Sequence, residues 1–416
     1  LNRDTDPLSP ENVLMFMTGV FCGSNLATSG RFVVCSKSPY TGIWGESNCG
    51  GFFGPELRKT GYDGIIINGA SDKPVFLEIT ENGAEIKDAS DLWSKGTLET
   101  TDILKKKSGS DLTRVVCIGP AGENLVKYAI IASEEKAAGR TGMGAVMGSK
   151  KLKAITVRGK KVAYEPANPE GFKEIVKTSN EKVQSAFLTQ ILGSLGTACA
   201  LDSYNVSGEL PIKYWTQAQW GDSYNISGST AAEKIFTKSY PCFACPIGCA
   251  KKAEVKEGEY KTDGEIEAPE YETIAGFGSM ILNSNLESIV KANYLCNDYG
   301  IDTISGSSTI AFVYYLFNEG KIKADDIDGL EPKWGEVKPM LEMIKKISMR
   351  EGIGDLLAEG SDAIGNKFNI SKDEIATVYG MEVPYHDSRA VFGMAITYGL
   401  ASPRGPCHTS SDMYNL

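Results

Sequence analysis

The sequence has only two histidines, His386 and His408, and both lie near its C-terminal end. A Ser-His-Asp hydrolase, or a metal site made of several histidines, is difficult to assemble from so few. At most one of them is expected to be catalytic. His408 directly follows a tight segment that ends at Cys407 and is the candidate, with a structural role as the alternative. His386 is expected to be an ordinary surface residue.

The sequence also lacks long apolar runs and an excess of positive charge. No run of eighteen apolar residues occurs, so no membrane-spanning helix is predicted. The net charge of -10, without a basic stripe, argues against nucleic acid as a partner. Ten cysteines without a pairing rhythm favour reduced thiols, and this predicts a cytoplasmic protein. The chain opens with Leu1 and stops at Leu416 just after a dense Gly/Pro/Cys/His segment, so sequence is expected to be missing at both termini.

Three cysteines, Cys242, Cys245 and Cys249, are gathered in the run PCFACPIGCAKK. A loop with two- and three-residue gaps can place thiolates on three corners of an iron-sulfur cubane, which leaves a fourth ligand to come from elsewhere. Zinc is the alternative, although its sites usually pair two short turns and no second turn exists here. Unrelated thiols are the remaining possibility. The spacing favours an iron-sulfur cluster.

The pattern of residues changes along the chain. Short runs rich in β-branched residues, separated by glycine-rich turns, recur over the first 160 residues. They include 32–34, 65–67, 114–118 and 154–157, and Asn82-Gly83 between two runs predicts a hairpin with a type I′ turn. Helical spacing follows in 171–192, 284–300 and 337–347. We therefore expect an α+β protein with a β-rich domain at 1–162, a helical domain at 163–375 and the start of a third, helical domain at 376–416.

Two glycine-rich segments lie in the β-rich part. The first holds Arg31 and Asn48-Cys49-Gly50-Gly51, and the second holds Arg140-Thr141-Gly142. Backbone amides close on a ligand where glycine has no Cβ, and an adjacent arginine adds donors for phosphate. Neither segment matches a Walker loop or a dinucleotide fingerprint. Both are interpreted as anion-binding loops, with tight turns in a twisted sheet as the alternative.

The helical part contains an acidic segment and a polar turn. EIEAPEYETIAGFGS includes Glu272. In NDYGID, Gly300 suits the end of one helix and Asp302 the N-cap of the next. This pattern predicts a structural turn between two helices, and a contact with a ring or a phosphate is the alternative.

Together these segments resemble the aldehyde ferredoxin oxidoreductase family of tungsten-pterin enzymes. The resemblance runs from TSGR and TGIWGESNCGG through GRTGMGAVMGSKKLKAI, the cysteine loop, PEYETI and NDYGIDTIS to SPRGPCH. It implies an N-terminal β domain that forms the base for two pterins holding tungsten or molybdenum, covered by helical domains. It also implies a four-iron four-sulfur cluster that passes electrons to ferredoxin.

The resemblance assigns roles to individual residues. Cys242, Cys245 and Cys249 are implied as cluster ligands, Glu272 as the proton acceptor, and His408 as the hydrogen-bond partner of the substrate oxygen. A magnesium ion bridging the pterin phosphates is implied at Asn48 and a carbonyl near Thr141. The implied contacts to the pterins are Arg31, Asn48, Gly50, Arg140, Thr141, Gly142, Asn297, Ile301 and Asp302.

The sequence departs from the family pattern at several positions. Asn297 replaces an aspartate, and Ser410 replaces a lysine. The second D-x-x-G-L-C element, which supplies the fourth cluster cysteine, has no match. Cys296 and Cys407 are substitutes in principle, but truncation explains the absence more simply. A subunit-bridging iron is not expected, because no histidine lies between Glu272 and Pro384.

The expected activity is oxidation of aldehydes to carboxylic acids in an anaerobic cell, with electrons passed through the cluster to ferredoxin or an iron-sulfur partner subunit, in an oligomeric assembly. One alternative is the tungsten subunit of a class II benzoyl-CoA reductase. Another is a non-catalytic iron-sulfur electron-transfer subunit.

Overall fold

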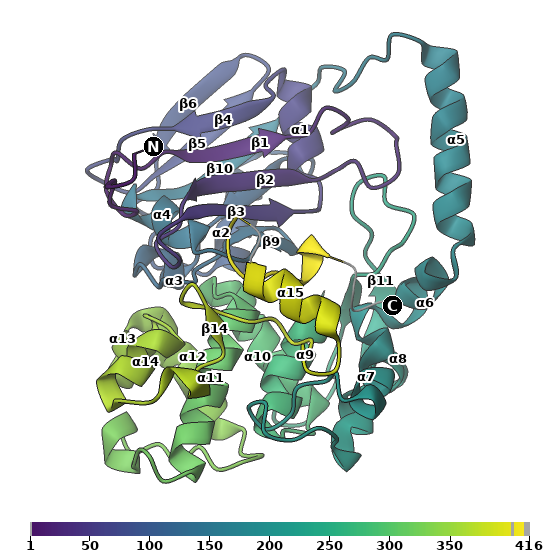
Figure 1. Cartoon of the computed structure of the whole chain (residues 1–416). Helices are drawn as coiled ribbons and strands as arrows, with labels where there is room; N and C mark the ends of the chain where they lie inside the picture. Colours follow the sequence, from purple (N-terminus) through teal and green to yellow (C-terminus); the bar gives the residue numbers. More distant parts are fainter. Residues whose placement is uncertain (1, 401–402, 412–416) are drawn as a thin grey trace. The chain divides into compact units, whose positions relative to one another are not determined.

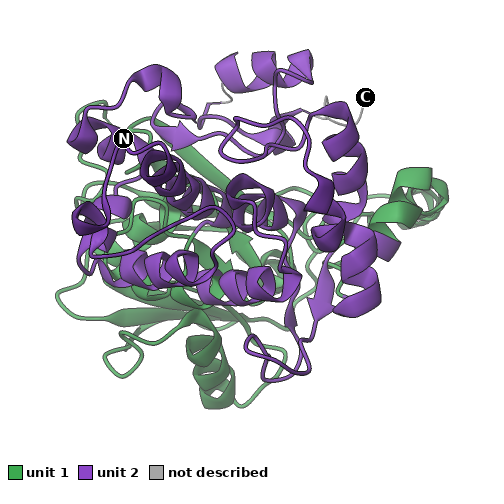
Figure 2. Cartoon of the chain, turned by 90° about the horizontal axis from the view of Figure 1, so that it is seen from below, with its two compact units in different colours: residues 1–193, 240–249, 297–301 green, residues 194–239, 250–296, 302–416 purple. Residues whose placement is uncertain are grey.

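The computed structural model describes residues 2–400 and 403–411, and its elements are labelled in Figure 1. The chain divides into two compact units, coloured in Figure 2. Residues 1–193, 240–249 and 297–301 form the first unit, and residues 194–239, 250–296 and 302–416 form the second. The expected domain boundaries after 162 and 375 stay predictions. Leu1 and parts of the expected third domain, 401–402 and 412–416, lie outside the described residues.

Two sheets form the body of the first unit. One is antiparallel, with the order β3-β2-β1-β4, and consists of β1 (Leu14–Thr18), β2 (Phe32–Lys37), β3 (Trp44–Cys49) and β4 (Gly64–Ile67). The other has the order β6-β5-β10-β7-β8-β9, and only its β5 and β10 pair is parallel. Its strands are β5 (Val75–Thr80), β6 (Gly83–Asp88), β7 (Arg114–Cys117), β8 (Ile131–Ser133), β9 (Lys136–Ala138) and β10 (Leu152–Arg158). The four predicted β-rich runs all fall on these strands, which confirms them.

The core of the first unit is shared by both sheets. Phe16 and Phe32 of the first sheet belong to the same buried cluster as Ile155 of the second. Helices α1 (Phe53–Thr60) and α4 (Met143–Ser149) contribute to this cluster, while α2 (Thr97–Ser108) packs in a separate one. A short helix, α3 (Pro120–Glu123), lies between β7 and β8 in the chain. Apolar side chains on one face of each strand explain why two sheets pack together here.

The predicted hairpin forms, but its predicted turn is wrong. Thr80 pairs with Gly83, so the two loop residues are Glu81 and Asn82. Within this turn, which the structure describes completely, only Gly83 has a positive φ, of 136°. A type I′ turn needs a positive φ at both central residues. The register of the strands places the turn one residue earlier than the Asn-Gly pair suggested.

Helices dominate the chain after residue 163, which confirms the predicted α+β class. The three predicted helical segments are helical in the structure, and the buried positions of α12 recur every three or four residues. The helices are α5 (Pro169–Ser185), α6 (Phe187–Leu195), α7 (Leu201–Ser207), α8 (Gly228–Lys234), α9 (Tyr271–Phe277), α10 (Leu286–Tyr299), α11 (Thr303–Asn318), α12 (Lys338–Met349), α13 (Ile353–Leu357), α14 (Ser361–Phe368) and α15 (Phe392–Leu400).

Short strands accompany these helices. They are β11 (Phe236–Ser239), β12 (Lys251–Ala253) and β13 (Ile266–Glu267) in one sheet, and β14 (Thr377–Val378) and β15 (Met381–Glu382) in another. Among the described residues, no helix has the length and apolar character required to span a membrane.

Candidate functional site

Arg31 and Asn48, from the first glycine-rich segment, lie together at the end of the β2–β3 pair. The register sets Phe32 opposite Cys49, so the residue before β2 faces the end of β3. Arg31 Nε donates to Asn48 Oδ1, and its Nη2 donates to the Asn48 carbonyl oxygen over 3.2 Å. Both residues are exposed. The structure thus brings together two of the predicted pterin contacts in a position that a phosphate can reach.

The second glycine-rich segment lies against the same strand. The amide of Arg140 donates to Ser47 Oγ at 3.1 Å, which ties this segment to β3. Thr141 and Gly142 have φ values of 71° and 74°. A Cβ on Gly142 would lie 2.0 Å from the carbonyl oxygen of Lys127, so only glycine fits there. Both predicted anion-binding loops therefore converge on β3 within the first unit.

The two oxygens expected to bind magnesium already accept hydrogen bonds. Arg31 donates to Asn48 Oδ1, and Ser38 Oγ donates to the Thr141 carbonyl oxygen at 2.8 Å. Each oxygen keeps a second lone pair that a hard cation can use. The magnesium site stays a prediction.

The cysteine loop packs against the first glycine-rich segment, although nearly two hundred residues separate them in the chain. A Cβ on Gly50 would lie 2.8 Å from Cys242 Sγ, and one on Gly30 would lie 2.7 Å from the Cβ of Phe243. The amide of Thr28 donates to the carbonyl of Ala244 at 2.9 Å. These contacts require glycine at positions 30 and 50. The thiols therefore lie beside the predicted pterin loop, in the same unit.

The three thiols of the cysteine loop lie within the first unit. Cys242, Cys245 and Cys249 are all half-buried, and Gly248 between them has a φ of 65°. Over the ranges 2–400 and 403–411, no three His, Cys, Asp or Glu side chains are grouped tightly enough to hold one metal ion. The choice between an iron-sulfur cluster and zinc stays a prediction.

The turn after α10 has the predicted geometry. Gly300 has a φ of 81°, and Asp302 Oδ1 accepts the amide of Ile304 at 3.0 Å as the N-cap of α11. Within the first unit, the carbonyl of Asn297 accepts from Thr97 Oγ1 at 2.8 Å, and Ile301 bridges to Ala129. The structural reading of the turn is confirmed, and its predicted pterin contacts stay predictions.

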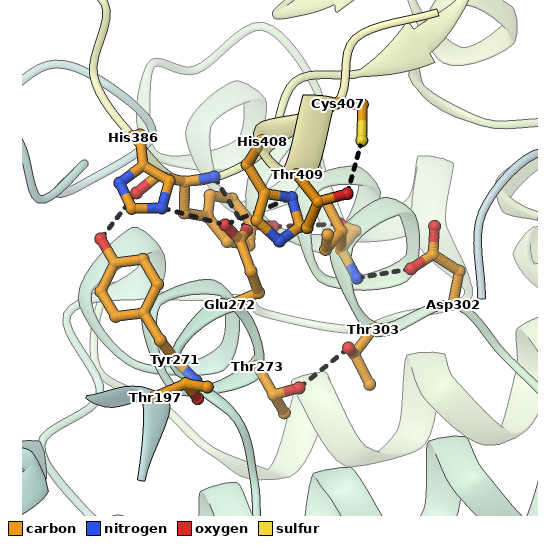
Figure 3. A network of polar contacts seen from close by, with 12 residues as sticks. Thr197, Tyr271, Glu272, Thr273, Asp302, Thr303, His386, Cys407, His408 and Thr409 are labelled. Atoms are coloured by element: carbon orange, nitrogen blue, oxygen red, sulfur yellow. Dashed lines mark hydrogen bonds and ion pairs between the residues drawn. The ribbon is translucent and has the colours of Figure 1, made fainter. Parts of the chain in front are cut away.

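Glu272 and His408, the two predicted catalytic residues, lie together in the second unit (Figure 3). Glu272 is in the first turn of α9 and is buried, and its Oε2 accepts the amide of Tyr385 at 2.9 Å. The other oxygen, Oε1, lies 3.8 Å from His408 Nδ1. His408 itself begins a 3₁₀ turn, η6 (His408–Ser410). An acid–base side chain and a hydrogen-bond donor are thus held side by side.

His386 is buried, and its predicted surface position is wrong. It is 3% exposed, and its Nδ1 lies 2.7 Å from Glu209 Oε1 while its Nε2 lies 3.6 Å from Glu272 Oε1. The rings of Tyr204 and Tyr271 pack against it with centroids 5.3 and 5.0 Å away. The sequence gave no local signal, because Glu209 is 177 residues away and belongs to no motif.

Two buried tyrosines hold this site in place. The hydroxyl of Tyr271 donates to the Tyr385 carbonyl at 2.6 Å, and that of Tyr385 donates to the Ile304 carbonyl at 3.0 Å. Burial, together with the charge of Glu272, raises the pKa of both phenols well above the usual value. Both phenols therefore remain protonated and donate these hydrogen bonds, while the amide of Tyr385 holds Glu272 Oε2.

The two substitute cysteines differ in how readily they ionise. Burial, reinforced by Asp302, raises the pKa of Cys296, which lies inside α10. Burial would also raise the pKa of Cys407, but the Arg404 guanidinium and two neighbouring hydroxyls outweigh it and lower that pKa.

Comparison with known proteins gives a consistent result. The family model described as aldehyde ferredoxin oxidoreductase, N-terminal domain, matches residues 1–159, and that for domains 2 and 3 of the same family matches residues 174–416. The tungsten-containing aldehyde ferredoxin oxidoreductase of Pyrococcus furiosus is 39% identical over 99% of this chain and 67% of its own length. That of Thermococcus kodakarensis is 37% identical over the same shares.

More distant relatives carry other activities in their names. The WOR-like subunit of an aliphatic sulfonate oxidoreductase from Pyrococcus furiosus is 32% identical over 98% of this chain and 67% of its own length. Among solved structures, the active-site complex BamBC of benzoyl coenzyme A reductase, bound to 1,5 dienoyl-CoA, aligns with a TM-score of 0.80 and 30% identity. The alignment covers 93% of this chain and 60% of the chain in that structure.

Proposed function

Because this chain belongs to the aldehyde ferredoxin oxidoreductase family, we propose that it is a tungsten-pterin oxidoreductase that oxidises aldehydes to carboxylic acids and passes the electrons to ferredoxin. The observation that carries this proposal is the pair of buried Glu272 and half-buried His408, 3.8 Å apart, in a chain 39% identical to a tungsten-containing aldehyde ferredoxin oxidoreductase. We also propose a cytoplasmic location and an oligomeric assembly for this chain.

Most of the residues that would hold the cofactors belong to the first unit. Arg31, Asn48, Gly50 and the loop 140–142 would bind the pterins and their phosphates, with magnesium at Asn48. Asn297, Ile301 and Asp302 are proposed as further pterin contacts. Cys242, Cys245 and Cys249 would bind a four-iron four-sulfur cluster. When bound, these groups accept two electrons from the substrate and release them one at a time.

The side chains of the second unit would handle protons and charge. An aldehyde and a water molecule give a carboxylic acid, two electrons and two protons. Glu272, held by the Tyr385 amide, takes a proton from the attacking water or its adduct. His408 donates a hydrogen bond to the substrate oxygen as negative charge develops there. Burial of Glu272 strengthens both interactions because it excludes competing water.

Replacement of Glu272 by glutamine tests this assignment. The amide keeps the shape and the hydrogen bond from Tyr385 but cannot accept the proton, so kcat for aldehyde oxidation is expected to fall at least about 100-fold. Tungsten and iron per chain should stay at the wild-type level. Glu265→Gln is the matched control, since Glu265 lies in the same segment but pairs with Lys238 at the surface. Normal turnover by Glu272→Gln would refute the role.

A second candidate is the tungsten subunit of a class II benzoyl-CoA reductase, which the TM-score of 0.80 to the BamBC complex favours. Substrate preference separates the two, because aldehydes and aromatic acyl-CoA esters can be assayed with the same preparation. A non-catalytic electron-transfer subunit is the third candidate. Iron without tungsten in the purified protein would favour it.

A further inference from the structure

His386 stands between two buried carboxyl groups. Its Nδ1 is hydrogen-bonded to Glu209 Oε1 at 2.7 Å, and its Nε2 faces Glu272 Oε1 at 3.6 Å. All three side chains are at least nine-tenths buried. Burial of two carboxyl groups around one imidazole costs free energy that apolar residues in the same positions would not cost. The arrangement therefore calls for a function.

The hydrogen bond that Glu209 accepts sets the tautomer of His386. An ionised carboxylate can only accept, so Nδ1 carries the proton when the ring is neutral. This leaves the lone pair of Nε2 directed at Glu272. The 3.6 Å separation exceeds a hydrogen bond by roughly 0.5 Å, a gap that a small movement closes, and catalytic hydrogen bonds commonly tighten when substrate binds.

His386 also lines a cavity within the second unit. The cavity has a volume of about 360 Å³, and Trp215, Val383, His386, Arg389 and Tyr398 are among its lining residues. The Arg389 side chain is 68% exposed, so this cavity reaches the protein surface. Water in this cavity is the proposed acceptor of a proton that leaves His386.

The number of protons released in each turnover explains why such a path is useful. On the proposed function, each turnover releases two protons, and Glu272 can hold only one. Its Oε2 is hydrogen-bonded by the Tyr385 amide, and the phenols of Tyr271 and Tyr385 remain protonated. Glu272 must therefore lose its proton to another group before it can act again.

We infer that His386 and Glu209 form a proton relay that removes the proton from Glu272 before it accepts the next one. The Oε1–H bond of Glu272 breaks as an Nε2–H bond forms on His386. The Nδ1 proton passes to Glu209, water in the cavity takes the Nε2 proton, and Glu209 then returns its proton to Nδ1, which restores the starting tautomer. One proton enters and one leaves, and no electrons move. This inference rests on the proposed function, because it assumes that Glu272 accepts protons.

The groups around His386 come from several elements. Glu272 and Tyr271 come from α9, Tyr204 from α7, and Glu209 from the segment after α7. The ring of His408 stacks with its centroid 6.1 Å away. The carboxyl groups of Glu209 and Glu272 are thus the acids in direct line with the two ring nitrogens.

Chemical rescue distinguishes a relay from a structural role. His386→Ala and Glu209→Gln are expected to lower kcat on the order of 10- to 100-fold, with KM within about two-fold, because proton transfer rather than binding is impaired. Imidazole added to His386→Ala should enter the cavity and raise kcat of this variant several-fold. It should not rescue Glu272→Gln. Arg389→Gln changes another residue that lines the cavity, so it measures how far a disturbed cavity by itself lowers kcat. A kcat within two-fold of wild type for either relay variant, or no rescue at wild-type tungsten and iron content, would overturn the relay.

A second measurement does not depend on turnover. Because residues 1–416 contain only two histidines, ¹⁵N-histidine labelling of the oxidised holoenzyme gives a simple spectrum, in which His386→Ala identifies the resonances of His386. The neutral His386 ring should carry its proton on Nδ1, and Glu209→Gln should shift the population toward Nε2. A wild-type ring protonated on Nε2 would overturn the relay even if the variants do not load metal. Failure of the wild-type enzyme to oxidise any aldehyde would instead refute the proposed function.

Discussion

Thiols in this chain fall into two groups by their surroundings. Burial raises the pKa of Cys49 to about 12 and that of Cys117 to about 11, so both stay protonated at neutral pH and are poor metal ligands. The three cysteines of the 242–249 loop are half-buried and lie on a loop held by glycine contacts. At the scale of single residues, burial therefore separates Cys49 and Cys117 from the three loop thiols that are proposed to bind iron.

Cys242→Ser tests this selection. Loss of one of three closely spaced thiolates should remove the cluster, so iron per chain is expected to fall severalfold and the cluster signal in electron paramagnetic resonance spectra to disappear. Cys199→Ser is the matched control, because Cys199 is also half-buried but lies outside the loop. Equal iron content in the two variants would contradict the assignment of Cys242 as a ligand.

The second glycine-rich segment shows how an element positions a site. Its glycines are not equivalent. A Cβ on Gly142 would lie 2.0 Å from the Lys127 carbonyl oxygen, on a backbone with a φ of 74°, whereas a Cβ on Gly139 would meet nothing within 4 Å. The requirement for glycine is therefore local to the turn that leads into α4.

Gly142→Ala should consequently displace the loop. A left-handed conformation costs an alanine about 1–2 kcal/mol, and the contact with Lys127 adds to this. We expect a melting temperature lower by several degrees and reduced tungsten content, measured by calorimetry and plasma mass spectrometry. Gly139→Ala, in the same loop, should match the wild type in both. A Gly142→Ala protein with full tungsten content would show that the loop does not bind the pterin.

The sequence predicted the turn between α10 and α11 correctly, but it predicted the wrong turn for the hairpin of β5 and β6. Asp302 caps α11 as predicted, because a cap depends on a side chain and an amide two residues apart. The hairpin turn instead follows the register of β5 and β6, which the neighbouring strand β10 also constrains. Local chemistry decided the first element, and sheet pairing decided the second.

At the scale of the whole molecule, the proposal predicts a defined metal content. Protein purified without oxygen from its native source should contain about one tungsten and about four irons per chain, measured by plasma mass spectrometry. Removal of tungsten during growth should abolish aldehyde oxidation, unless molybdenum replaces it, while iron stays bound. Zinc in place of both metals would overturn the cofactor assignment.

The sequence by itself determined the fold class, the main helices and strands, and the site residues that belong to motifs. These features depend on residues close together in the chain, such as the hydrophobic spacing of α12 or the gaps between Cys242, Cys245 and Cys249. The family resemblance linked Glu272 to His408, and the structure places them 3.8 Å apart.

Only the tertiary structure decided which distant segments meet. It joined the loop at 240–249 and the turn at 297–301 to the β-rich unit, and it buried His386 between Glu209 and Glu272. Neither result has a local signal. Contacts between residues more than a hundred positions apart depend on how whole elements pack, and a histidine that reads as a surface residue becomes part of the site only when that packing encloses it.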